Sequence, residues 1–120
     1  MTEAPIPPGE MTLDELRAAL APLVPAHAAF DGWSDEALAM AAAELHVPSE
    51  RAKLCFPGGS VEMIDAWFDA IDRAMAKAWP LERISQLKIR QRIRDLVTYR
   101  LEVIHPHKEA LRRAFAILAQ

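Results

Sequence analysis

The strongest restriction on the fold comes from residues 60–79, where apolar side chains recur at intervals of three and four residues. This spacing places them on one face of an α-helix, because the helix has 3.6 residues per turn. The apolar face comprises Val61, Ile64, Trp67, Phe68, Ile71, Met75, Ala78 and Trp79. The opposite side carries four carboxylates, Glu62, Asp65, Asp69 and Asp72. The stretch therefore predicts a long amphipathic helix whose apolar face needs a partner.

Two more helical patterns follow Pro80, which breaks or bends the chain. The first is a second long helix with an apolar stripe of Ile89, Ile93, Leu96, Val97 and Ile104, flanked by Arg83, Arg90 and Arg94. The second starts with Pro106 in its first turn and directs Leu111, Ala114, Phe115 and Leu118 inward. No stretch alternates as a strand does, and no internal repeat is present. We therefore predict an all-α bundle of about six helices.

The N-terminal part of the chain starts with a proline-rich stretch, residues 1–11, which we expect to be flexible. Thr12 and Glu15 have the spacing of a capping box, so the first helix is expected to start there. We expect Pro22 and Pro25 to kink or end this helix, since proline disrupts helix interiors.

Residues 12–59 have the proportions of a three-helix, helix-turn-helix subdomain. Ser34 is expected to cap its second helix, and His46 to adopt the left-handed conformation at that helix's end. Ser49 is expected to cap a short third helix. A Phe-Pro-Gly-Gly corner then leads into residues 60–120, which we interpret as the first helices of a ligand-binding domain.

A helix-turn-helix invites comparison with DNA-binding proteins, but its charge argues against DNA as a partner. Residues 31–59 contain two cations, Arg51 and Lys53, against five acidic residues. DNA-binding surfaces need several basic side chains for phosphates and bases. Residues 1–79 have a net charge of −8 and residues 80–120 a net charge of +5. This asymmetry indicates that the two parts either dock on each other or face different partners.

The sequence contains no constellation typical of an enzyme. Cys55 follows an apolar residue and is interpreted as a small core side chain. His105 and His107 form a pair without a further ligand at metal-binding spacing, so no metal and no cofactor are expected. The start of the chain does not resemble a targeting peptide, and no apolar run is long enough to cross a bilayer. We therefore expect a non-catalytic, cytoplasmic protein.

Two broad apolar faces remain, one on each long helix. They either pack against each other as core or line a ligand cavity. The candidate liners of such a cavity are Trp67, Phe68, Ile71, Met75, Trp79, Leu96, Val97 and Leu101.

The residues also resemble a known family. A helix-turn-helix that ends in a Phe-Pro corner is similar to the TetR-type repressors. The run FDGWSDEALAMAAAELHVPSERAKLCFPGGSVEMIDAWF resembles more closely the ubiquinone biosynthesis protein nine family, as do KIRQRIRDLVTYRLEVI and HPHKEALRRAFAIL. The resemblance covers residues 13–119. Its most specific pieces are the stretch from Gly32 to Leu38 and the FPGG corner.

The resemblance implies a homodimeric lipid-binding accessory protein with a TetR-like fold. Such proteins hold isoprenoid quinone intermediates, phospholipids or other lipids in an apolar cavity, and they present the intermediate to the demethoxyubiquinone hydroxylase. It also implies a location peripheral to the inner membrane. Family members continue beyond the position of Gln120, so their hydroxylase-docking and membrane-binding surfaces cannot be assigned to residues of this sequence. We expect a truncated relative that dimerises to cover its exposed faces.

Three functional hypotheses follow. The first is a lipid-binding accessory protein of ubiquinone biosynthesis. The second is a TetR-type DNA-binding transcriptional regulator. The third is a helical dimerisation module.

Overall fold

The computed structural model describes residues 6–120, and every regular element in that range is helical. The α-helices are α1 (Leu13–Leu20), α2 (Val24–Asp31), α3 (Asp35–Glu44), α4 (Ser49–Leu54), α5 (Ser60–Ala78), α6 (Leu81–Ser85), α7 (Ile89–Ile104) and α8 (Lys108–Leu118). Two 3-10 turns are η1 (Pro8–Glu10) and η2 (His105–His107). The predicted all-α fold is confirmed. There are more helices than expected because the first predicted helix is divided at residues 21–23 and α6 precedes α7.

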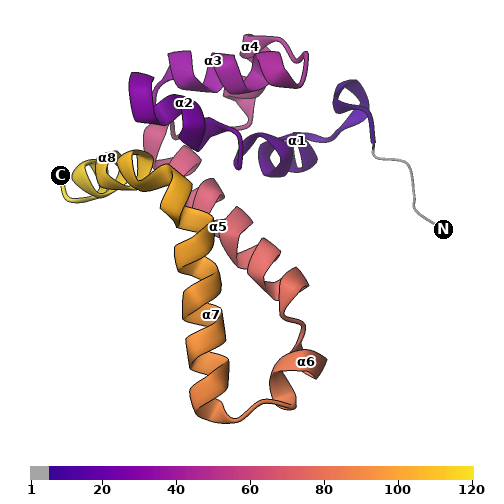
Figure 1. Cartoon of the computed structure of the whole chain (residues 1–120). Helices are drawn as coiled ribbons and strands as arrows, with labels where there is room; N and C mark the ends of the chain where they lie inside the picture. The colour runs from indigo at the N-terminus through magenta and orange to yellow at the C-terminus, as the bar shows by residue number, and fades with distance from the viewer. Residues whose placement is uncertain (1–5) are drawn as a thin grey trace.

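The molecule has two parts, which we call the head and the arm (Figure 1). The head consists of residues 13–71 and 108–118, in which α1 to α4 lie beside α8 and the first half of α5. The arm consists of residues 72–104, in which α5 leaves the head, α6 forms the far end and α7 returns. The principal extents of the whole are 47 × 42 × 21 Å.

The starts of α1 and α3 follow the sequence prediction. Thr12 and Glu15 exchange both hydrogen bonds of a capping box, at 3.0 and 3.1 Å. Ser34 Oγ accepts from the Ala37 amide at 3.2 Å. At the end of α3, His46 adopts a positive φ of 56°, which ends the helix in the expected left-handed conformation.

Two predicted helix starts are wrong in detail, and so is the role expected of one proline. Ser49 is the first residue of α4 and makes no capping hydrogen bond, because Pro48 occupies the N-cap. Pro106 lies in η2 rather than in the first turn of α8. The first helix does end just before Pro22, at Leu20, but Pro25 stands near the start of α2, where its missing amide hydrogen is tolerated.

The segment before α1 is attached to the head. The Arg51 guanidinium donates to the carbonyl oxygens of Pro8 and Met11, at 2.7 Å for Pro8. These bonds hold the described end of the segment that was predicted to be flexible. The remainder of that prediction, for residues 1–5, lies outside the described residues.

The core lies entirely within the head. Its largest fully buried side chains include Leu16, Leu20, Leu38, Met63 and Ile64. No residue between 72 and 104 is buried. The arm therefore projects from a packed head without a core of its own.

Trp33 connects the parts of the head that are distant in sequence. Its indole Nε1 donates to the carbonyl oxygen of Ala110 at 2.9 Å, which fixes the start of α8. Its ring lies 5.4 Å from that of Trp67 on α5, and its carbonyl oxygen accepts from Ser60 Oγ. Trp33 thus sets how α5 and α8 meet.

Candidate functional site

An apolar groove of about 380 Å³ lies where α5, α7 and α8 meet. It is lined by Phe68, Ile71, Asp72, Arg100, Ile104, Leu111 and Phe115. The groove is open to solvent, since the Phe115 side chain is 57% exposed. Its volume lies near the lower end of the range typical of small-molecule sites.

The local sequence explains how the groove forms. Phe68 and Ile71 are three residues apart on α5 and share one face of that helix. After Ile104, η2 redirects the chain, so α8 crosses the top of α7 (Figure 1). Leu111 and Phe115, four residues apart on α8, then face back toward α5 and α7.

The polar side chains of the groove form one ion pair at its rim. Arg100 of α7 donates to the carboxylate of Asp72 of α5, and both side chains are about half exposed. An exposed pair of this kind contributes only about 0–1 kcal/mol to stability. The guanidinium has five N–H donors, so Arg100 retains donors for a carbonyl or hydroxyl oxygen of a ligand.

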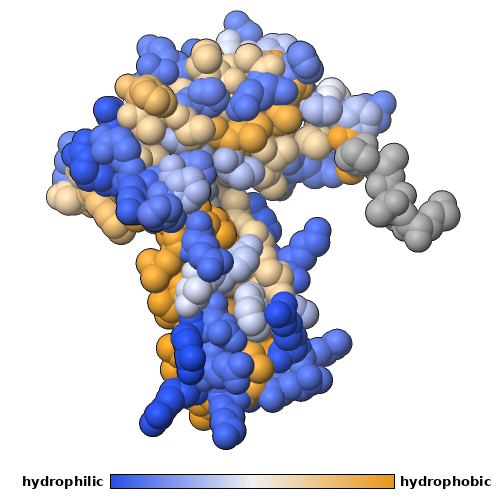
Figure 2. Space-filling model, in the orientation of Figure 1, coloured by the Kyte–Doolittle hydropathy of each residue, from blue (hydrophilic) through white to orange (hydrophobic). Residues whose placement is uncertain are grey.

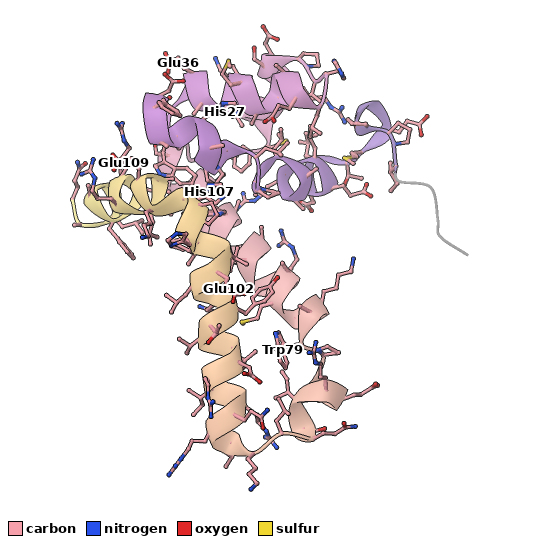
Figure 3. The ribbon with its side chains drawn as sticks, viewed as in Figure 1. His27, Glu36, Trp79, Glu102, His107 and Glu109 are labelled. Atoms are coloured by element: carbon pink, nitrogen blue, oxygen red, sulfur yellow. The ribbon has the colours of Figure 1, made fainter. Side chains whose placement is uncertain are left out.

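A cluster of aromatic rings around Trp67 lies next to the groove and shares Phe68 with it. Trp67 is 2% exposed, and its ring lies 5.6 Å from Phe68 and 6.1 Å from His107. His107 lies where η2 meets α8 (Figure 3). Burial lowers the pKa of His107, because a charged imidazolium loses hydration there. Burial in this cluster therefore favours the neutral form of the His107 imidazole.

The predicted cavity liners do not share one site. Phe68 and Ile71 line the groove, whereas Trp67 is buried and borders a separate hollow of about 120 Å³ with Val103 and His107. Met75 and Leu96 are half-buried in the arm outside the groove. Trp79 borders a separate hollow of about 170 Å³ with Asp95, Thr98, Tyr99 and Glu102; Figure 3 shows Trp79 at the far end of α5 and Glu102 on α7.

Val97 and Leu101 are exposed rather than turned toward α5, at 50% and 64%. The predicted stripe of α7 therefore combines two faces, since Leu96 lies about 100° from Val97 around the helix axis. Arg83, predicted to flank the same stripe, lies in α6. Its guanidinium stacks 3.8 Å above the Trp79 ring and donates to the Ala78 carbonyl oxygen.

The sequence analysis did not predict the ion pair between the two charged residues of the groove, Asp72 and Arg100. Asp72 was assigned to the row of carboxylates opposite the apolar face, without a partner, and Arg100 was not singled out, because the 28 residues between them leave no local pattern. Of the apolar liners, Phe115 and Leu111 were expected inward as ordinary core. Their four-residue spacing on the last helix was the available signal.

Both cations of the predicted helix-turn-helix are engaged within the chain. Arg51 binds the carbonyl oxygens near η1, and Lys53 Nζ lies 3.9 Å from Asp35 Oδ2. Leu54, at the end of α4, is exposed. This surface offers few free donors to phosphates or base edges.

Other reactive groups do not assemble a site. Cys55 is buried, and burial raises the pKa of its thiol, which disfavours the reactive thiolate. Among residues 6–120, no three His, Cys, Asp or Glu side chains are placed to hold a metal ion. Within the same range, no helix is both long and apolar enough to cross a bilayer.

Comparisons of the chain with protein-family models, with curated proteins and with solved structures found no match. The resemblance to the ubiquinone biosynthesis protein nine family therefore stays a prediction.

Proposed function

We propose that this chain is a non-catalytic protein that binds an amphipathic lipid, of the isoprenoid quinone class, in the groove between α5, α7 and α8. The observation that carries the proposal is the composition of the groove. Five of its seven lining side chains are apolar, and its charged groups are confined to the Asp72–Arg100 pair at the rim. A quinone has the matching chemistry: an apolar tail, and ring oxygens that accept hydrogen bonds.

The size of the groove indicates which part of such a lipid it holds. About 380 Å³ accommodates a head group and the first tail units, but not a long polyprenyl chain. The remaining tail would lie along exposed apolar side chains beyond the groove. Leu101 is the nearest of these, since it follows Arg100 on α7.

Native mass spectrometry with solvent extraction tests the proposal. The protein is incubated with a short-chain ubiquinone, and the expected result is a bound species that organic solvent releases. Ile104→Gln introduces a polar amide into the groove and should lower occupancy. Ile89→Gln makes the same change on the same helix at an exposed site outside the groove, so its occupancy should equal that of the unsubstituted protein. Absence of a bound species, or equal loss in both variants, would contradict the proposal.

A role in delivering the bound lipid to an enzyme is supported by the sequence resemblance alone. We propose that the bound intermediate is presented to the demethoxyubiquinone hydroxylase, as in the family that the sequence resembles. The test is the hydroxylation rate of the purified hydroxylase with and without this protein. An increase that Ile104→Gln abolishes supports the role, and an unchanged rate excludes it.

A further inference from the structure

Hydrogen bonding at the rim of the groove is incomplete. Of the described residues that line the groove, Asp72 and Arg100 alone have polar side chains. One Nη of Arg100 donates to Oδ1 of Asp72, and within the described part of the chain the second carboxylate oxygen, Oδ2, accepts no hydrogen bond. The guanidinium has further N–H groups beyond the one that this bond uses. The rim therefore offers an acceptor and several donors to a bound molecule.

The helical spacing puts both charged groups next to the apolar lining of the groove. Asp72 lies four residues after Phe68 on α5, and Arg100 lies four residues before Ile104 on α7. Residues four apart are neighbours on one face of a helix. Figure 2 shows hydrophobic surface beside hydrophilic side chains where the arm joins the head, the region in which the groove lies. A ring that packs on the apolar side chains of the groove therefore has its substituents within reach of the pair.

The pair suits a hydroxyl group better than a carbonyl group. A quinone oxygen only accepts hydrogen bonds, so it can use the Arg100 donors but is opposed by the lone pairs of Asp72. A phenol or quinol hydroxyl both donates and accepts. It can therefore donate to Asp72 Oδ2 while its oxygen accepts from Arg100. A hydrogen bond to a carboxylate is stronger than one between neutral groups.

We propose that the groove prefers the hydroxyl-bearing form of its lipid, a prenylated phenol or quinol, over the corresponding methyl ether or quinone, and that Asp72 determines this preference. The inference rests on the proposed function, because it refers to an isoprenoid lipid bound in this groove. The preference is one of binding alone, and no bond of the ligand is formed or broken.

The charges of the pair disfavour a charged head group. Asp72 and Arg100 lie in contact and have no net charge together. A phosphate placed against Arg100 would also meet the Asp72 carboxylate, and an amine placed against Asp72 would also meet the guanidinium. Like charges oppose both contacts. A neutral hydroxyl meets neither repulsion, so the groove fits a prenylated phenol better than a phospholipid.

Isothermal titration with two matched ligands tests the preference. The ligands are ortho-geranylphenol and its methyl ether, which share one tail and differ in whether the ring oxygen carries a hydrogen. The phenol should bind about tenfold more tightly, at the lower end of what a hydrogen bond to a charged group contributes, because water competes at the half-exposed rim. In oxygen-free buffer, a short-chain ubiquinol should likewise bind more tightly than the matching ubiquinone.

Asp72→Ala tests the role of the carboxylate. It should reduce the ratio of the two affinities to about one, because it weakens binding of the phenol and leaves binding of the methyl ether as it was. A purely structural role of the pair would instead weaken both ligands equally. Asp72→Asn keeps a neutral oxygen acceptor and should give an intermediate ratio.

Asp65→Ala is the matched control. It removes an exposed carboxylate of the same row on α5, outside the groove, and should keep the full preference for the phenol. Circular dichroism of each variant checks that the helices are retained.

Failure of the preference and failure of the proposed function are distinguishable. Equal affinities for the phenol and the methyl ether would overturn selection by Asp72 but keep lipid binding in the groove. The same holds for an undiminished preference in Asp72→Ala, for an equal loss of both ligands in that variant, and for the same loss of preference in Asp65→Ala. If no ligand binds, the proposed function is refuted and the preference is refuted with it.

Discussion

The head and the arm contain similar helices in different environments. In the head, α5 buries Ile64, Trp67 and Ile71 against α1, α2 and α8. In the arm, α7 has apolar side chains at equally regular spacing, yet none of its residues is buried. Regular apolar spacing thus identifies the apolar face of a helix. Whether that face is buried depends on elements elsewhere in the chain, or on a partner, that pack against it.

The largest contrast between the two parts should be in stability. Trp67→Ala removes a ring that is packed against Trp33 and Phe68, so we expect it to lower the free energy of unfolding by about 3–5 kcal/mol. Leu101→Ala, at an exposed position of α7, should change it by no more than about 0.5 kcal/mol. Urea denaturation measures both. A similar loss in the two variants would show that the Leu101 side chain is covered in solution.

A smaller difference in stability is expected between substitutions of Trp33, which connects α5 and α8 in the head, and of Trp79 in the arm. Trp33→Phe leaves the Ala110 carbonyl oxygen without its buried indole donor, which should cost about 1–3 kcal/mol in urea denaturation. Trp79→Phe in the arm is the control. It weakens only the exposed stacking with Arg83 and should cost no more than about 1 kcal/mol. The reverse order would contradict the division into a packed head and an open arm.

A pH effect on stability should arise at His107, where η2 meets α8. The folded-state pKa of His107 is below 6.5 because of burial, so the unfolded chain binds the proton more readily. The corresponding stability is therefore present above pH 6.5 and is lost as pH falls through the folded-state pKa. We expect the urea midpoint to decrease over this window. His107→Gln should reduce the decrease, whereas His105→Gln, at an exposed position, should leave it as it is. A midpoint whose pH dependence is the same in both variants would refute this assignment.

The smallest expected effect on stability is at the rim of the groove. Arg100→Gln removes the ion pair with Asp72, and because both side chains are about half exposed, we expect a change of no more than about 1 kcal/mol. The same variant should weaken quinone binding, since the shorter, neutral amide does not replace the guanidinium donors of the rim. Isothermal titration of the ligand and urea denaturation of the variant separate these effects. A large loss of stability with unchanged affinity would show that the pair is structural.

The sequence predicted the helices more successfully than the site. Helix α5 and the caps at Thr12 and Ser34 depend on local spacing, and the structure contains them. Local spacing could not distinguish the two faces of α7, so Leu96 and Val97 were assigned to one surface. The rim pair of Asp72 and Arg100 depends on how α5 and α7 cross, which no short pattern encodes.

Ligand titration of tryptophan emission tests the central proposal most directly. Trp79→Phe provides the background, because the two remaining tryptophans, Trp33 and Trp67, are buried at 3% and 2% exposure and the Trp67 ring lies 5.6 Å from that of the groove residue Phe68. A short-chain ubiquinone should quench their emission in a saturable manner. Ile104→Gln should weaken the affinity about tenfold, because it removes apolar contact area from the groove. Ile93→Gln, at an exposed position of α7 outside the groove, should leave the affinity unchanged. Quenching that does not saturate, or that is equal in the two variants, would contradict a lipid site in this groove.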